Sequence, residues 1–104
     1  DLRNTRVVDI LRELEEYGAS VLVHDPIADS KEAKREYGIT LARLEDMREL
    51  DALVVAVAHK EYASFDMCVV RQWFKNPEAS VVMDVKGIWK PEAVREAGLT
   101  YWRL

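Results

Sequence analysis

Three short polar segments each follow an apolar run in this sequence, and they hold the residues best suited to chemistry. The segments are His24-Asp25-Pro26, His59-Lys60-Glu61 and Asp84-Val85-Lys86. A short unbroken apolar run is typical of a strand whose two faces are both covered. If the three runs belong to one parallel sheet, their carboxyl ends meet at one edge, where the ligands of such sheets bind. The pattern predicts a cleft lined by His24, Asp25, His59, Lys60, Asp84 and Lys86.

Lys86 is the strongest candidate for binding an anion. It precedes Gly87, and a flexible ammonium group beside a residue without a side chain can approach a phosphate closely. The alternatives are a solvated surface lysine or an ion pair with Asp84. Arg3 and Asn4 lie at the start of a predicted helix, where the phosphate of a nucleotide often binds. Their alternatives are a surface charge for Arg3 and a simple helix cap for Asn4.

The spacing of the candidate ligands and of the single thiol argues against metal binding and covalent catalysis. His24, Asp25, His59 and Asp84 follow three different strands, and none of them forms a pair such as His-x-x-x-His. We therefore expect no metal site, and we expect Asp25 to cap the loop that it begins. Cys68 has no histidine at a useful spacing, so we expect a semi-buried side chain and not a nucleophile.

Length, charge and composition restrict the class of protein. The chain has 104 residues and a net charge of −4, which suits one hydrophobic core and disfavours nucleic acid as a partner. No apolar run approaches the length of a membrane span, and no signal or lipidation motif is present. One cysteine excludes an internal disulfide and fits a reducing compartment. These features predict a cytoplasmic protein without a membrane partner.

Helical and strand patterns alternate along the chain, which indicates an α/β fold with a doubly wound, Rossmann-like parallel sheet and helices on both faces. Apolar spacing predicts helices over 7–16, 30–37, 44–50, 65–74 and 91–97, and apolar runs predict strands over 21–23, 39–41, 52–58, 80–83 and 100–103. Trp73 and Phe74 fit the core face of their helix. Trp89 and Trp102 are expected to be partly exposed.

The first strand of this fold is expected upstream of the sequence. A doubly wound domain normally begins with a strand, whereas this chain begins with the helix that should follow it. In a sheet ordered 3-2-1-4-5 the first strand is central, so its loss would leave open edges on the strands around Leu22 and Val55. We therefore expect the natural polypeptide to continue upstream of Asp1. The isolated chain could pair these two strands directly, but the core would have to loosen, so we expect it to associate with a second copy.

Four motifs together resemble one enzyme family. They are Asp1-Leu2-Arg3-Asn4-Thr5, His24-Asp25-Pro26, Ala58-His59-Lys60-Glu61 and Asp84-Val85-Lys86-Gly87. In this order and at this spacing they resemble the C-terminal domain of the UDP-glucose/GDP-mannose dehydrogenase family. The resemblance covers essentially the whole chain, 1–104. The third and fourth motifs are more similar to the UDP-N-acetylhexosamine branch than to UDP-glucose dehydrogenases.

The resemblance implies the UDP-binding domain of a longer enzyme that serves polysaccharide biosynthesis. Such an enzyme oxidises the C6 hydroxyl of a nucleotide-linked sugar to a carboxylate in two NAD-dependent steps. The family binds NAD in an N-terminal domain and carries its catalytic cysteine in the central part, which Cys68 does not match. This sequence has no Gly-x-Gly-x-x-Gly either, so the chain alone is expected to be inactive.

The resemblance also implies partners and substrate-binding residues. The expected partners are the UDP-sugar substrate, the rest of the parent chain and a second copy in a homo-oligomer. Lys86 matches a position, arginine in some members, that contacts the substrate near its phosphates or sugar. Arg3 lies in the matching Asp-x-Arg motif and is expected to line the same cleft. A Phe-Lys pair that helps to hold the nucleotide in the family would lie upstream of Asp1.

A second class of function stays open from the residues alone. Doubly wound domains host many functions, so a free-standing ligand-sensing or protein-interaction domain of the same fold is the alternative. A receiver-like signalling domain is a third hypothesis, but the acidic cluster that should follow its first strand is missing together with that strand. An upstream dinucleotide fingerprint and catalytic cysteine in the same gene would favour the dehydrogenase.

Overall fold

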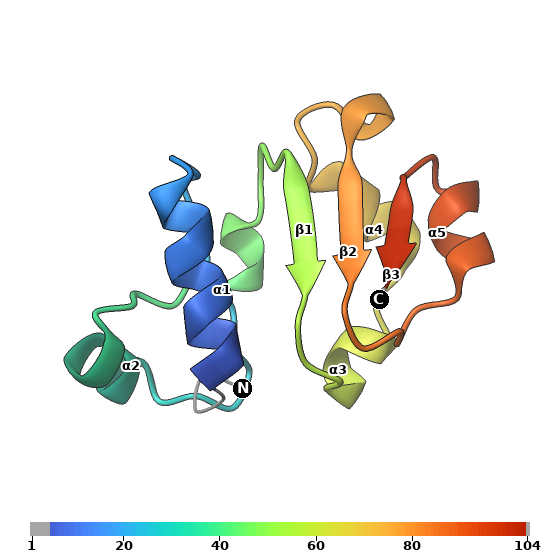
Figure 1. Ribbon diagram of the computed structural model, residues 1–104. Helices are drawn as coiled ribbons and strands as arrows, with labels where there is room; N and C mark the ends of the chain where they lie inside the picture. Colours follow the sequence, from blue (N-terminus) through green and yellow to red (C-terminus); the bar gives the residue numbers. More distant parts are fainter. Residues whose placement is uncertain (1–4, 104) are drawn as a thin grey trace. The chain divides into compact units, whose positions relative to one another are not determined.

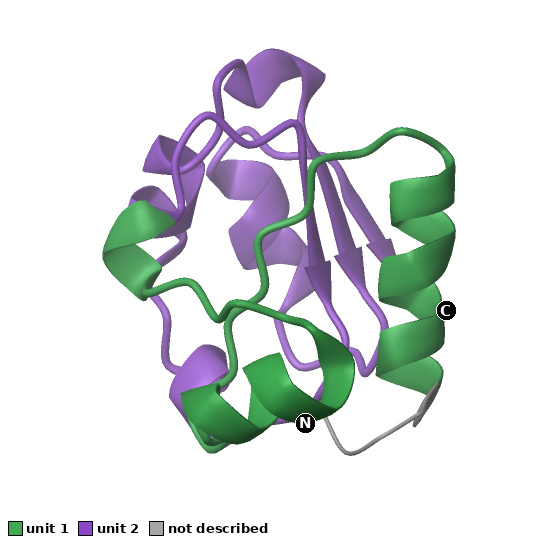
Figure 2. Ribbon diagram, turned by 90° about the vertical axis from the view of Figure 1, so that its left-hand side faces the viewer, with its two compact units in different colours: residues 1–46 green, residues 47–104 purple. Residues whose placement is uncertain are grey.

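The computed structural model describes residues 5–103 and divides into two compact units (Figures 1 and 2). Unit 1 comprises residues 1–46, and unit 2 comprises residues 47–104. Unit 1 holds two α-helices and a 3₁₀ turn, whereas unit 2 holds a parallel sheet with its own helices. Each unit has a separate cluster of buried apolar side chains, so each is described by itself.

Unit 1 consists of α1 (Thr5–Glu16), α2 (Ser30–Tyr37) and the 3₁₀ turn η1 (Leu44–Asp46). Helix α2 begins where Asp29 Oδ1 accepts hydrogen bonds from two backbone amides of the first turn. It ends at Gly38, whose φ of 68° lies in the left-handed region that glycine adopts readily. The small core of the unit is formed by Leu11, Ala33 and Ile39.

Unit 2 is built on three parallel strands in the order β1 (Ala52–Val55), β2 (Val81–Asp84) and β3 (Tyr101–Arg103). The register places Leu53, Val82 and Tyr101 in one row, and Val55, Asp84 and Arg103 in the row two residues further along the strands. The connecting elements are α3 (Lys60–Ala63), α4 (Met67–Gln72), the 3₁₀ turn η2 (Pro77–Ala79) and α5 (Pro91–Glu96). The predicted α/β class with a parallel sheet is confirmed.

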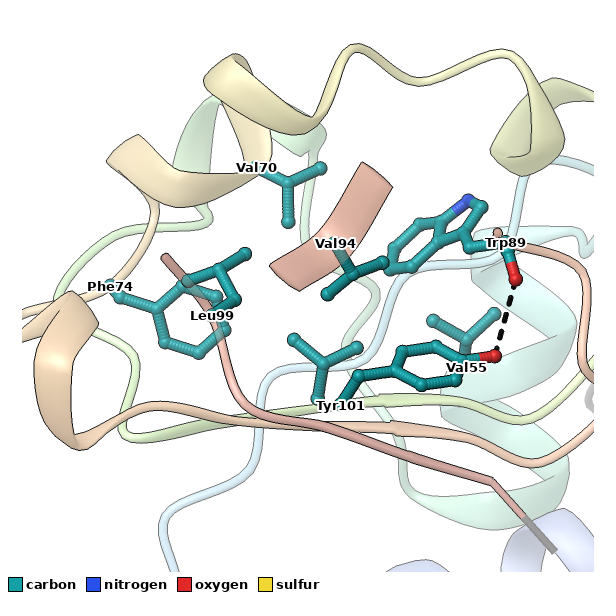
Figure 3. Packing of buried hydrophobic residues seen from close by; sticks show 8 residues of the cluster. Val55, Val70, Phe74, Trp89, Val94, Leu99 and Tyr101 are labelled. Atoms are coloured by element: carbon teal, nitrogen blue, oxygen red, sulfur yellow. Dashed lines mark hydrogen bonds between the residues drawn. The ribbon is translucent and has the colours of Figure 1, made fainter. Parts of the chain in front are cut away.

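The core of unit 2 lies on one face of this sheet (Figure 3). The cluster combines strand residues with Val70 of α4 and Val94 of α5, both fully buried. Its full set is Val55, Val70, Phe74, Val82, Trp89, Val94, Leu99 and Tyr101. Side chains of a strand alternate between the two faces, and Val54 and Trp102 on the other face are 39% and 57% exposed. The helices of unit 2 therefore cover the face that carries Val82 and Tyr101.

Several predicted elements are shorter than expected. The strand predicted over 52–58 ends at Val55, because the ladder to β2 ends where Val85 N donates to Val55 O. Residues 21–23 and 39–41 contribute only a single parallel bridge, between Val23 and Leu41. A strand extends only as far as a neighbouring strand can pair with its backbone N–H and C=O groups. An apolar run without such a partner therefore stays irregular.

Two predicted helices also differ from the structure. The helix expected over 44–50 is only the 3₁₀ turn η1, and Glu49 has a φ of 55°, which a right-handed helix cannot contain. The helix expected over 65–74 is α4, preceded by the separate turn α3. Asp66 separates the two, because its side chain accepts a hydrogen bond from Cys68 N and caps the start of α4.

The exposure of three residues tests the predicted core. Trp102 is exposed, as predicted. Trp89 was predicted to be partly exposed but is only 5% exposed, because its indole N–H reaches the backbone oxygen of Tyr62 inside the unit. Cys68 was predicted to be semi-buried and is exposed, since it lies on the outer side of α4 beside the buried Val70.

Candidate functional site

The loop that follows β2 is held by the carboxylate of Asp84, which is fully buried. Asp84 Oδ1 accepts a hydrogen bond from Ile88 N at 3.1 Å, and Oδ2 accepts from Trp89 N at 2.9 Å. Oδ2 also accepts from the Tyr101 hydroxyl at 2.8 Å. The sequence predicted that Asp84 lines a cleft, whereas the structure places it beneath the loop, where it fixes residues 85–89.

Lys86 and Gly87 form the exposed turn of this loop. Gly87 N donates to Asp84 O at 3.3 Å, and the φ of Gly87 is 66°, a conformation that other residues adopt at a cost. Lys86 is exposed, and among the residues that the structure describes it has no ion-pair partner. The alternative of an ion pair with Asp84 is therefore absent from the described part of the chain. The turn thus presents an ammonium group that pairs with no described carboxylate, directly before a residue without a side chain.

The loop after β2 is tied to the helical turn after β1. The indole Nε1 of Trp89 donates to Tyr62 O in α3 at 2.8 Å. Figure 1 shows that α3 and this loop lie at the same edge of the sheet, beyond the arrowheads of β1 and β2. The structure therefore brings the segment that begins at His59 and the loop that contains Lys86 to one edge, as the sequence predicted for parallel strands.

His59 and Lys60 begin the turn α3 at this edge. His59 Nδ1 accepts a hydrogen bond from Glu61 N at 3.1 Å, so a neutral His59 ring carries its proton on Nε2. Its ring contacts Tyr62 edge to face, with 5.8 Å between the ring centroids. Lys60 is exposed. The two side chains supply one N–H donor and one ammonium group near the turn that holds Lys86.

His24 and Asp25 belong to unit 1. Asp25 Oδ1 accepts from Ile27 N at 2.9 Å and from Ala28 N at 3.1 Å, so the predicted cap of its loop is confirmed. His24 is half-buried. Arg3 lies outside the described residues, and its expected role in substrate binding stays a prediction.

Arg103 is a cation that the sequence reasoning missed. It ends β3, where it pairs with Asp84 in the sheet register, and it is exposed. Its guanidinium group lies against Gly87, because a Cβ atom built on Gly87 would stand 3.4 Å from Arg103 Cζ. The rule that found Lys86 could have found Arg103 as well, since Arg103 also ends a predicted strand.

The Tyr101 hydroxyl has an altered acidity in this network. Burial raises the pKa of Tyr101 above its ordinary value of 10.0, and the hydrogen bond to Asp84 and the charge of that carboxylate raise it further. The Arg103 guanidinium opposes this by lowering the pKa of Tyr101. Tyr101 therefore acts as a neutral donor to Asp84 near neutral pH, which keeps the support of the loop intact.

The described side chains at the sheet edge are mainly cations and hydrogen-bond donors. No group of three or more His, Cys, Asp or Glu side chains in residues 5–103 is arranged to hold a metal ion. In the same range, no helix has the length and apolar character needed to cross a membrane. What the sheet edge offers is cations and N–H donors, which recognise anionic and polar groups.

The parallel sheet, its helices and the polar loops at its carboxyl edge place the chain in the Rossmann-like α/β class. Within that class, the chain belongs to the UDP-glucose/GDP-mannose dehydrogenase family. Residues 1–91 match the UDP binding domain of that family. The matched residues include all three polar segments that follow the predicted strands. The match confirms the resemblance found in the motifs. No solved structure matches the chain significantly.

Curated relatives extend the comparison along the whole chain. Protein CapL of Staphylococcus aureus is 35% identical over 104 residues, which is 100% of this chain and 24% of that protein. The UDP-N-acetyl-D-glucosamine 6-dehydrogenase of Salmonella typhi is 34% identical over 88% of this chain and 21% of its own length. That of Pseudomonas aeruginosa is 48% identical over 60% of this chain and 15% of its own length. The chain thus spans about a quarter or less of these relatives.

Proposed function

We propose that the chain is the nucleotide-binding part of an NAD-dependent UDP-sugar 6-dehydrogenase. The parent enzyme oxidises the C6 hydroxyl of the sugar to a carboxylate, and this part holds the UDP group of the substrate. The observation that carries the proposal is the loop 84–89, in which a buried carboxylate fixes the backbone and presents Lys86 beside Gly87. A rigid turn with a free ammonium group suits a phosphate.

The chain's own residues bind and orient the substrate in this proposal. Lys86 neutralises the phosphates, and Asp84 keeps the turn in place without contacting the ligand. His59 Nε2 and Lys60 offer a donor and a charge at the same sheet edge. Holding the nucleotide firmly fixes the sugar for reaction elsewhere in the enzyme.

NAD would accept the hydride from C6, and we assign its binding to the part of the parent enzyme outside this chain. The residues present do not suit a dinucleotide, because the sequence lacks the Gly-x-Gly-x-x-Gly segment that approaches a pyrophosphate. We accordingly expect the purified 104-residue chain to form no NADH from any UDP-sugar. NADH production by a preparation free of contaminating dehydrogenase would contradict this assignment.

The sugar of the substrate is proposed to be an N-acetylhexosamine. Two relatives that are 34% and 48% identical to the chain are UDP-N-acetyl-D-glucosamine 6-dehydrogenases, whereas a UDP-glucose 6-dehydrogenase of Rhizobium meliloti is 26% identical. We expect the parent enzyme to have the higher kcat/KM for a UDP-N-acetylhexosamine. A higher kcat/KM for UDP-glucose would reverse this part of the proposal.

The role of Lys86 is tested by kinetics of the full-length parent enzyme. Lys86→Ala should raise the KM for the UDP-sugar about tenfold or more, since a hydrogen bond to a charged group contributes about 1.5–3 kcal/mol. The KM for NAD should stay within about twofold of the parent value, because NAD binds elsewhere. Lys75→Ala is the matched control: Lys75 is also exposed, but its amide bonds to Leu50 O near the start of β1. If the KM for the UDP-sugar is unchanged in Lys86→Ala, Lys86 does not bind the substrate and is an ordinary surface lysine.

A further inference from the structure

We propose that Arg103 is a second cationic contact for the diphosphate of the nucleotide, acting together with Lys86 across Gly87. The inference rests on the proposed function, because it assigns Arg103 to the same anion. It adds a residue that lies beyond the part of the chain matched by the family, residues 1–91.

The sheet register brings Arg103 to the loop after β2. Asp84 and Arg103 are paired residues at the carboxyl ends of the neighbouring strands β2 and β3. From there the Arg103 side chain extends over the turn, since Cζ, Nε and Nη1 would lie 3.4, 3.5 and 3.6 Å from a Cβ atom on Gly87. Lys86 precedes this glycine directly. One cation thus belongs to the turn and the other lies against it.

Gly87 has the residue type that such an arrangement requires. Its φ of 66° is unfavourable for other residues. A side chain there would also meet the guanidinium group at the edge of ordinary contact. With only hydrogen on its α-carbon, Gly87 lets the Arg103 guanidinium group lie close to the backbone next to Lys86.

Within residues 5–103, the two cations at the turn, Lys86 and Arg103, form no ion pair. The nearest carboxylate in the register is that of Asp84, but it is fully buried and both of its oxygens accept other hydrogen bonds. An anion that reaches Gly87 would therefore meet two cations that form no ion pair with a described carboxylate.

The two cations differ in what they contribute. A lysine ammonium is a flexible point charge, whereas a guanidinium group presents a planar fork that can bind two phosphate oxygens at once. A diphosphate carries enough oxygens for both groups. We therefore expect each cation to contribute separately to the affinity for UDP and to contribute little for the uncharged nucleoside.

The test measures binding of UDP and uridine to the full-length parent enzyme by titration calorimetry. Arg103→Met should weaken UDP binding about tenfold or more, as expected for a lost charged hydrogen bond, and should change uridine binding by less than about twofold. Arg103→Lys keeps the charge and should recover part of the loss. Lys86→Met is measured beside it, and Lys75→Met serves as the exposed control. Should Arg103→Met lower the Tm, Arg103→Gln, which stays polar, takes its place.

The outcomes separate the inference from the proposed function. If Lys86→Met weakens UDP binding and the Arg103 variants do not, the inference is wrong and the proposed function stands. If neither residue affects UDP binding, the proposed function fails as well. Equal losses for UDP and uridine in Arg103→Met would also overturn the inference, because a contact to the diphosphate cannot act on a ligand without phosphate.

Discussion

The buried carboxylate of Asp84 offers a direct test of how the loop is built. In Asp84→Asn, one oxygen can still accept from Ile88 N or from Trp89 N, but the new amide group faces the other of these N–H donors. The Tyr101 hydroxyl can rotate and accept from the amide group, since it already lies 3.2 Å from Trp89 O. One buried backbone N–H is left without an acceptor, which costs about 1–3 kcal/mol.

The free energy of unfolding of the chain in urea measures this loss. The slope of this free energy against urea concentration, the m-value, should stay unchanged if only the stability has changed. Asp66→Asn is the matched control. Asp66 is also an aspartate that accepts from a backbone amide, Cys68 N at 2.8 Å, but it is exposed. Asparagine caps helices about as well as aspartate, so this control should lose less than about 0.5 kcal/mol.

The rate of hydrogen exchange at individual backbone amides gives a second measurement for Asp84→Asn. The exchange of the Ile88 or Trp89 amide should accelerate, while that of Val94, which donates to Lys90 O in α5, should change little. If Asp84→Asn loses no more stability than Asp66→Asn and the loop amides keep their protection, the loop is not held by this carboxylate. The explanation of the rigid turn at Lys86 would then be refuted.

Three further predictions concern other parts of unit 2. Val70→Ala should lower the free energy of unfolding by about 2–3 kcal/mol, because Val70 is fully buried. Val69 lies on the same helix but is 47% exposed, so Val69→Ala should lower it by less than about 0.5 kcal/mol. Equal losses in the two variants would contradict the packing of α4. Cys68 is exposed, so it should react with a thiol reagent in the native protein, and Cys68→Ser should leave activity of the parent enzyme unchanged. Because the pKa of Tyr101 is raised in the folded state, the stability that this shift provides is present below pH 10.0 and is lost as the pH rises through the folded pKa. Urea unfolding above pH 10.0 should therefore show a smaller loss with rising pH in Tyr101→Phe than in the parent chain, and identical slopes would argue against the shift.

Local signals in the sequence predicted the ends of several elements correctly. Asp29 and Gly38 bound α2, and Pro91 begins α5, as the capping rules indicate. The apolar runs also predicted where β1 and β2 lie. The placement of Lys86 followed from one property of parallel sheets, namely that residues after different strands meet at one edge. These predictions succeeded because each depends on a few adjacent residues or on the direction of the strands.

The lengths of the strands and the depth of the polar residues could not be predicted in the same way. The run after Ala52 is apolar as far as Ala58, yet β1 ends at Val55, because strand length depends on a partner that is distant in sequence. Trp89 was predicted to be partly exposed, but it is buried because the fold brings Tyr62 O within hydrogen-bond distance of its indole N–H. Unpaired polar groups are costly in the interior, so a side chain is buried only where tertiary contacts satisfy it.

The sequence by itself determined the α/β class, the family and the position of Lys86 at a strand end. Only the tertiary structure decided that Asp84 supports the loop from below and that Arg103 lies against Gly87. The physical reason is the separation in sequence between the residues that interact. Capping and strand direction act between neighbouring residues, whereas the Tyr101 hydroxyl that donates to Asp84 lies seventeen positions away along the chain. The contacts of Tyr101 with Asp84 and of Arg103 with Gly87 exist only after β2 and β3 have paired, because pairing fixes which side chains share the carboxyl edge.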